Sequence, residues 1–122
     1  MGGLKRGEFR TATGPGYTGK PRPVLILHDD AFAATGSVLV ALVTTDPTVA
    51  PLLRLPVAPD ATNNLSRACR VMVDKIMAVP RAKVGGFVGA LDARGMARIN
   101  AMAATVLGLA RPASGTPGTD SP

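Results

Sequence analysis

Short apolar runs separated by polar turns recur along most of this chain, and this pattern predicts a series of β-strands. Residues 23–28 and residues 37–45 form continuous apolar runs short enough for buried strands, and β-branched residues dominate the second run. In the run at residues 52–57, the internal Pro56 predicts an edge position or a bulge, because proline cannot donate to a sheet ladder. Further strands are predicted at residues 5–12, 69–74 and 87–90, and residues 76–79 continue the apolar character that begins at residue 69.

Turn-forming residues and one helical repeat complete the pattern. Residues 13–21 are rich in Gly, Pro and Thr and predict a mobile loop, and residues 59–65 predict a polar turn. Asp92 is a candidate N-cap for a C-terminal helix that ends near Gly108. Apolar residues recur at helical spacing along this helix, namely Met96, Ile99, Ala103, Val106 and Ala110. The predicted fold is therefore mainly β, a small barrel of five or six strands with one C-terminal helix.

The composition fits one domain with a tail. A chain of 122 residues suffices for one compact domain, and a hydrophobic content of 46% excludes general disorder. Aromatic residues make up only 3%, so the core must be aliphatic. We expect one domain over residues 1–110, whereas residues 111–122 are dominated by Pro, Ser, Gly and Thr and predict a disordered tail.

The chain carries an excess of positive charge. Fourteen Lys and Arg face eight Asp and Glu, which gives a formal charge of +6 and a pI near 10.5. This balance favours a polyanionic partner, namely nucleic acid, an anionic membrane or an acidic protein, and a merely soluble basic surface is the alternative. No apolar stretch approaches the length of a membrane span and no signal peptide opens the chain, so we expect a cytoplasmic protein without a membrane partner.

Several kinds of chemistry lack the residues they need. The single His28, the single Cys69 and scattered carboxylates form no cluster with ligand spacing, so neither a metal nor another cofactor is expected. Cys69 lies in an apolar run and His28 ends a strand, so both are interpreted as structural residues of a protein in a reducing compartment. Residues 14–16 lack the downstream Gly, Lys and hydroxyl that a nucleotide-binding loop requires.

Four positions remain as candidates for chemistry. Arg22 lies between Pro21 and Pro23, which stiffen the backbone and suit a side chain that must hold a fixed geometry. The alternative is an arginine that simply flanks a strand. Thr44 and Thr45 end the second long strand and are equally well explained as β-formers. Asp74 precedes Lys75, and an ordinary ion pair between the two is a sufficient explanation.

Read in order, these pieces resemble the MazF/PemK toxin family. Each motif is weak alone, but five of them in the correct order are specific. The matching segments are Arg6-Gly7-Glu8, residues 22–27, residues 40–45, residues 73–80, and residues 88–91 with the following helix to residue 109.

The resemblance implies an SH3-like barrel of the MazF/PemK/CcdB type that forms a homodimer. It also implies cleavage of single-stranded mRNA without a metal, in which the ribose 2′-hydroxyl attacks the adjacent phosphate. Arg22 matches the family's catalytic Arg and would stabilise the developing charge or act as the acid, while Thr44 would hold a phosphate oxygen. Lys20, Arg22 and Thr45 are expected to bind RNA. The resemblance further implies a cognate, acidic, MazE-like antitoxin.

The sequence also departs from the family pattern. Many relatives carry a Glu-Gln pair in the first loop, and the corresponding place here is near Tyr17-Thr18. Relatives of the Kid type use an Asp with an Arg two positions before it. Asp74 matches that Asp and is our predicted general base, although Met72 stands at the Arg position. Two alternatives therefore stay open, a CcdB-like toxin that poisons gyrase and an RNA-binding barrel without catalytic activity.

Overall fold

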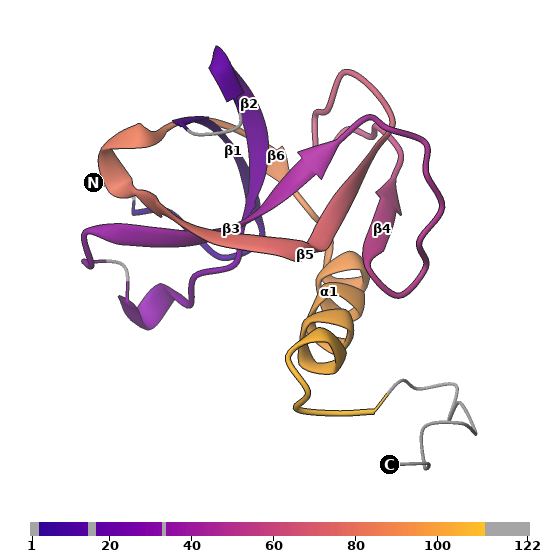
Figure 1. Ribbon diagram of the computed structural model, residues 1–122. Coiled ribbons are helices and arrows are strands. Elements are labelled where there is room, and N and C mark those ends of the chain that lie inside the picture. Colours follow the sequence, from indigo (N-terminus) through magenta and orange to yellow (C-terminus); the bar gives the residue numbers. More distant parts are fainter. Residues whose placement is uncertain (1–2, 15–16, 33, 112–122) are drawn as a thin grey trace.

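The computed structural model describes residues 3–14, 17–32 and 34–111, and a curved antiparallel sheet dominates it (Figure 1). One C-terminal helix follows the last strand. The elements are β1 (Glu8–Gly14), β2 (Tyr17–Ile26), η1 (Asp30–Phe32), β3 (Ser37–Thr44), β4 (Arg54–Val57), β5 (Cys69–Pro80), η2 (Arg81–Lys83), β6 (Val84–Ala90) and α1 (Ala93–Val106). The predicted fold, mainly β with a C-terminal helix, is confirmed.

The sheet has two edges and is an open form of the predicted barrel. Its strand order is β4-β5-β3-β2-β1-β6, and every neighbouring pair is antiparallel. Within the described ranges no ladder joins β4 to β6. Pro56 lies on the edge strand β4, opposite Arg70 of β5. Its edge position was predicted, and it agrees with the missing N–H of proline.

One prediction about strand limits is wrong, and one strand is longer than predicted. Apart from residues 15 and 16, which lie outside the described residues, the predicted loop at 13–21 is a hairpin formed by the ends of β1 and β2. Ala12 pairs with Arg22 and Gly14 with Tyr17. The predicted strand at 69–74 and its apolar continuation at 76–79 form one strand, β5, with an irregularity after Met72. In both places the neighbouring strand satisfies the backbone, which no local sequence pattern reveals. The predicted tail at 112–122 also lies outside the described residues.

Apolar residues pack on both sides of the central strands. One cluster includes Phe9, Leu25, Val71 and Ile99, and the last of these fixes α1 against the sheet. A second cluster consists of Ala12, Val24, Ile26, Val38, Val40 and Val79. Because β2 and β3 contribute to both clusters, their sequences are continuous apolar runs and do not alternate.

The helix begins and ends where the sequence indicates. The Asp92 side chain accepts a hydrogen bond from the Gly95 N–H at 2.7 Å, as an N-cap does. The helix ends at Val106, and Gly108 follows with φ +77°. Ala110 therefore lies beyond the helix and is exposed, so its predicted place on the apolar face is wrong.

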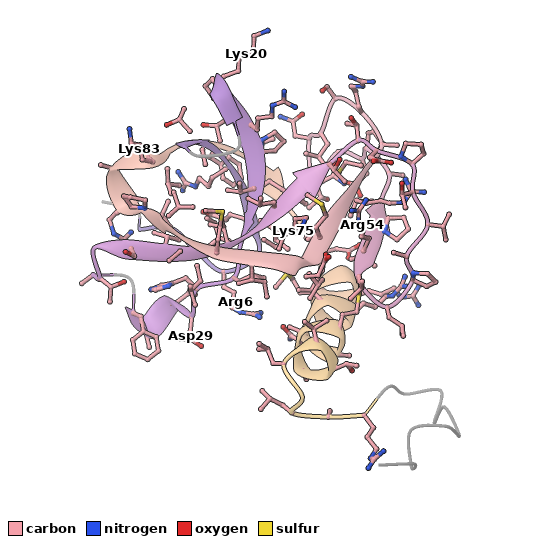
Figure 2. The ribbon with its side chains drawn as sticks, viewed as in Figure 1. Arg6, Lys20, Asp29, Arg54, Lys75 and Lys83 are labelled. Carbon is pink, nitrogen blue, oxygen red and sulfur yellow. The ribbon has the colours of Figure 1, made fainter. Side chains whose placement is uncertain are left out.

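The opening Arg6-Gly7-Glu8 motif joins the helix to the sheet. Arg6, labelled in Figure 2, donates from Nε to the Leu27 carbonyl at 2.9 Å and from Nη2 to Asn100 Oδ1 at 2.6 Å. Gly7 has φ +92°, a conformation that favours glycine. The motif is therefore a structural tie between the end of β2 and α1.

Candidate functional site

A pocket of about 210 Å³ lies where β2 and β3 meet the segment after β4. We name it the Arg22 pocket. Its walls come from three separate stretches of chain that the fold brings together. The lining residues are Arg22, Pro23, Val43, Thr44, Thr45, Leu65, Ser66, Arg67 and Cys69.

The pairing of β2 with β3 brings Arg22 and Thr44 to the same end of one ladder. The last pair of that ladder joins Val24 to Leu42; Arg22 precedes Val24 by two residues, and Thr44 follows Leu42 by two. Arg22 is exposed and Thr44 is half-buried. The Thr44 Oγ1 accepts a hydrogen bond from the Asp46 N–H at 3.0 Å, which leaves its own O–H free to donate. The sequence-based candidates Arg22, Thr44 and Thr45 thus share one pocket.

The charge in this pocket is positive and uncompensated. Across residues 3–14, 17–32 and 34–111, neither Arg22 nor Arg67 forms an ion pair, and the salt bridge that is formed joins Arg10 to Glu8 at 2.9 Å. No carboxylate lines the pocket. Two guanidinium groups and several hydroxyls in a confined space suit a bound anion such as a phosphate.

Cys69 forms part of the wall of the Arg22 pocket. It is 6% exposed, and burial raises the pKa of its thiol above the ordinary value of 9.0. The side chain therefore stays protonated near neutral pH and acts as an apolar wall. This agrees with the structural role predicted for it.

His28 is likewise a structural residue. Its Nε2 lies 2.6 Å from the Phe32 carbonyl oxygen and 3.1 Å from the Thr35 hydroxyl, and its Nδ1 accepts from the Leu39 N–H at 3.4 Å. These contacts tie the η1 segment to β3. Since its ring nitrogens are engaged there, His28 is not a member of the Arg22 pocket.

Lys20 and Asp74 lie outside the Arg22 pocket. Lys20 lies near the start of β2 and points away from the sheet in Figure 2. Asp74 is exposed and lies between Met72 and Ile76, where the pairing of β5 with β3 is irregular. Met72, at the position where Kid-type relatives carry Arg, is buried.

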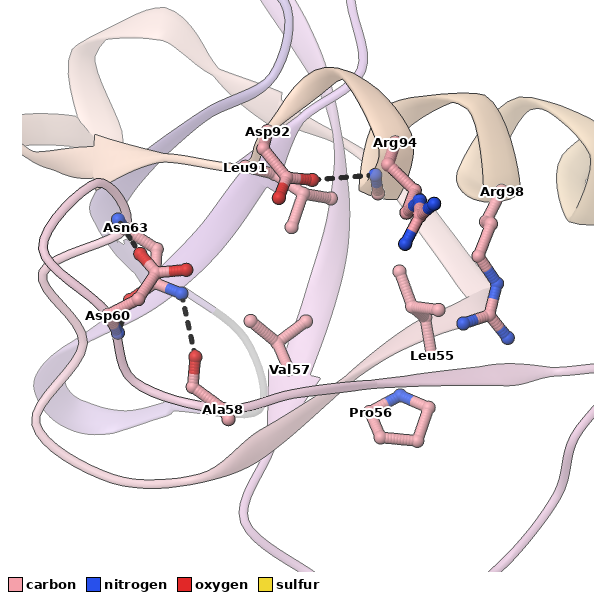
Figure 3. Close-up of a pocket in the computed structure, with 11 residues that line it drawn as sticks. Leu55, Pro56, Val57, Ala58, Asp60, Asn63, Leu91, Asp92, Arg94 and Arg98 are labelled. Carbon is pink, nitrogen blue, oxygen red and sulfur yellow. Dashed lines mark hydrogen bonds between the residues drawn. The ribbon is translucent and has the colours of Figure 1, made fainter.

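Ser66 and Arg67 are pocket residues that the sequence analysis missed. They follow a turn fixed by the buried Asn63, whose Oδ1 accepts from the Asp60 N–H at 3.0 Å (Figure 3) and from the Leu65 N–H at 3.0 Å. The Asn63 Nδ2 donates to the Ala58 carbonyl at 2.9 Å. The polar turn was predicted, but nothing in its local sequence indicates that it places an arginine in the same pocket as Thr44.

The close packing of this turn against β6 depends on a glycine. A Cβ on Gly89 would overlap the Asn63 carbonyl group. In addition, the Ala90 N–H donates to the Thr62 carbonyl at 3.0 Å, which joins the turn to the edge of the sheet. The turn that precedes Ser66 and Arg67 is thus fixed both by its own hydrogen bonds and by its contact with β6.

The part of the chain that the structure describes contains neither a metal-binding cluster nor a helix that could span a membrane. Within the described part of the chain, no three or more His, Cys, Asp or Glu residues gather in a way that could hold a metal ion. The helices described there include none with the length and apolar character needed to cross a membrane.

Comparison with known proteins gives consistent matches. Residues 5–107 match the family model of the PemK-like, MazF-like toxin of type II toxin-antitoxin systems. The probable endoribonuclease MazF of Mycolicibacterium smegmatis is 44% identical over 108 residues, which covers 88% of this chain and 99% of that protein.

Two solved structures illustrate the structural similarity. A mycobacterial endoribonuclease in complex with its cognate antitoxin is 26% identical, with a TM-score of 0.70 over 92% of this chain and 100% of that one. The Mycobacterium tuberculosis toxin MazF-mt6 is 25% identical, with a TM-score of 0.72 over 84% of this chain and 98% of that one.

Proposed function

Because this chain belongs to the PemK-like, MazF-like toxin family of type II toxin-antitoxin systems, we propose that it is a toxin endoribonuclease that cleaves single-stranded mRNA. The observation that carries the proposal is the pocket that Arg22, Arg67 and Thr44 line together with no carboxylate in the lining. Such a pocket attracts a phosphate and presents donors to its oxygens.

The proposed reaction is an internal transesterification. The ribose 2′-hydroxyl gives its proton to the general base and its oxygen forms a bond to the adjacent phosphorus, while the bond from phosphorus to the 5′-oxygen breaks. The departing 5′-oxygen takes up a proton, for which Arg22 is the proposed acid. The products carry a 2′,3′-cyclic phosphate and a 5′-hydroxyl. The Arg22 guanidinium supplies two parallel N–H donors to the phosphorane oxygens, and the free O–H of Thr44 donates to one of them.

The general base is proposed on different grounds. Asp74 is the base that the family resemblance implies, whereas Arg22 and Thr44 are also supported by the geometry of the pocket. Asp74 is exposed in the irregular part of β5 and does not line the Arg22 pocket, so its role as the base is proposed from the resemblance alone. Substitution of Asp74 therefore tests the resemblance independently of the pocket.

The same donors make a metal unnecessary in the proposed mechanism. A guanidinium and a hydroxyl take over the charge stabilisation that a divalent ion provides in metal-dependent nucleases. We therefore propose that the enzyme has no cofactor, and that cleavage continues in excess chelator.

The proposed partners are RNA, an acidic antitoxin and a second copy of the chain. One matched structure is an endoribonuclease in complex with its cognate antitoxin. The formal charge of +6 here would attract an acidic, MazE-like chain, which would compete with RNA for the same arginines. Because mRNA is its proposed substrate, the proposed location is the cytoplasm. If co-expression with the neighbouring open reading frame yields no acidic protein that co-purifies or relieves toxicity, the antitoxin part is wrong.

One assay separates the proposal from the two alternatives. The purified chain is incubated with labelled single-stranded RNA, and separately with gyrase and plasmid. The proposal expects the RNA to be shortened, whereas an RNA-binding barrel would only retard it and a gyrase poison would affect only supercoiling. The alternatives have less support, because the matched M. smegmatis relative is named an endoribonuclease.

A further inference from the structure

A second cluster of arginines surrounds another pocket, of about 240 Å³. Arg54 comes from β4, Arg70 from β5 and Arg98 from α1, and we name this the Arg54 pocket. Figure 2 shows Arg54 on the β4 side of the molecule. The other lining residues are Val49, Ala50, Pro51 and Pro56.

The fold forces these arginines together. On β4, Leu55 and Val57 are buried, so Arg54 and Pro56 lie on the opposite face. On β5, Val71 is buried, which places Arg70 on that same outer face, opposite Pro56. Arg98 projects from α1 toward β4, as Figure 3 shows.

The charges of this cluster are only partly compensated. Among the described residues, none of the three arginines forms a salt bridge. The Arg54 Nη1 is buried without a hydrogen-bond partner, and Arg70 donates from Nη1 to the Asp46 carbonyl oxygen at 3.2 Å. A buried, unpaired guanidinium nitrogen is costly, so the arrangement favours a bound anion that accepts from it.

The carboxyl group of Asp46 is exposed to the positive charges of Arg54 and Arg70. Hydrogen bonds from the Thr48 hydroxyl and N–H, at 2.7 and 2.9 Å, are the main cause of its lowered pKa. The charges of Arg54 and Arg70 lower the pKa further. The pocket thus already stabilises negative charge beside it.

Two contacts connect the two arginine pockets. Thr44 of the Arg22 pocket pairs across the sheet with Arg70 of the Arg54 pocket, and the Arg70 side chain donates to the Asp46 carbonyl, one residue after Thr45. The two pockets are therefore neighbours, close enough for one strand of RNA to occupy both.

We propose that the Arg54 pocket binds a backbone phosphate of the same RNA, at a nucleotide away from the cut. This inference rests on the proposed function. Guanidinium groups bind phosphate oxygens in pairs, and the valine and proline walls contact ribose or base without reading its edges. The pocket therefore adds affinity for longer RNA without adding sequence preference.

The test compares affinities for RNA of different lengths. Oligonucleotides with a 2′-deoxy sugar at the cut site are bound in fluorescence anisotropy, as a short core and as forms extended on the 5′ or 3′ side. One of the extended forms should bind the wild type more tightly than the core. Arg98→Gln should reduce this gain roughly tenfold, since a charge-assisted hydrogen bond is lost. The salt dependence of binding should also fall, with a slope about 0.7 smaller per lost phosphate contact.

A matched control is available one helical turn away. Arg94 and Arg98 both line the pocket drawn in Figure 3, and of the two only Arg98 also lines the Arg54 pocket. Arg94→Gln therefore removes the same charge from the pocket that the two share and leaves the Arg54 pocket intact. We expect Arg94→Gln to keep the full gain from core to extended RNA. Arg54→Gln should reduce the gain as Arg98→Gln does, and circular dichroism establishes that the variants fold.

Several results would overturn the inference. If Arg94→Gln and Arg98→Gln reduce the gain in affinity equally, the general positive charge of the surface explains the gain and the Arg54 pocket does not. If extension adds no affinity to a wild type that cleaves RNA, the inference alone fails. If the wild type neither binds nor cleaves any RNA, the proposed function fails as well. A polyglutamate peptide whose affinity falls in Arg98→Gln while the RNA gain persists would make the pocket an acidic-peptide site.

Discussion

The Arg22 pocket and the Arg54 pocket differ in what surrounds their arginines. They have similar volumes, about 210 and about 240 Å³, and are neighbours, because Thr44 of the first pairs with Arg70 of the second. The first adds the hydroxyls of Thr44, Thr45 and Ser66 to its guanidinium groups, whereas the second adds only Val, Ala and Pro. Hydroxyls beside guanidinium groups supply additional donors to the oxygens of a reacting phosphate, whereas the second pocket offers guanidinium donors alone. Changes in the first pocket should therefore alter rate, and changes in the second should alter affinity.

The largest effect is expected in the Arg22 pocket. Arg22→Ala and Thr44→Ala should each lower the single-turnover cleavage rate by roughly 100- to 1,000-fold, since removing one transition-state donor costs about 2.7–4 kcal/mol. Arg22→Lys should restore little, because one ammonium cannot reproduce the planar fork. The rates are measured with saturating RNA, and thermal melting checks that each variant folds. Unchanged rates in both alanine variants would remove the catalytic role of this pocket and abolish the contrast with the Arg54 pocket.

The sequence could reveal those elements whose signal lies within the element itself. Apolar runs at 23–28 and 37–45, Pro56 and the Asp92 cap predict β2, β3, the edge strand and the start of α1, because each signal is local. Residues 13–21 contain few apolar residues, so their pairing in the hairpin depends on a partner strand that a local pattern does not display.

The candidate site divides in the same way. Arg22, Thr44 and Thr45 could be named from the sequence because a motif carries them, and the register of β2 and β3 then brings them together. Arg67 enters the pocket through a turn fixed by buried hydrogen bonds. The arginines of the other pocket come from three elements that are far apart in the chain. Neither Arg67 nor the arginines of the Arg54 pocket can be assigned to a pocket without the tertiary structure.

A smaller effect is expected at Asp74, which belongs to neither pocket. Since the Arg22 pocket is proposed to supply most of the electrostatic stabilisation, Asp74→Asn should slow cleavage by no more than about 100-fold. This factor is the lower end of the range that loss of a general base produces. The pH dependence of the rate gives the decisive readout, because loss of a general base flattens the rise of the rate with pH. A profile identical to that of the wild type would show that Asp74 is not the base.

The smallest effect is expected at Cys69, in the wall of the Arg22 pocket. Burial raises the pKa of the thiol above its ordinary value of 9.0, so the group remains protonated well above neutral pH. Cleavage by Cys69→Ala should match that of the wild type from about pH 6 to about pH 8, because a neutral, buried thiol is inert. Alkylation of the folded protein should also be slower than that of the unfolded chain. Equal alkylation rates would show an accessible thiolate in the pocket.

The most direct test of the central claim is a map of RNA ends produced by the wild type and by Arg22→Ala in excess chelator. The wild type should generate new 5′ ends that carry hydroxyls, paired with 3′ ends that carry 2′,3′-cyclic phosphates. Arg22→Ala should leave the RNA largely intact over the same time. New ends with 5′-phosphates, ends that form equally well with Arg22→Ala, or cleavage that disappears in chelator and returns with a divalent ion would contradict the metal-independent mechanism at Arg22 and Thr44.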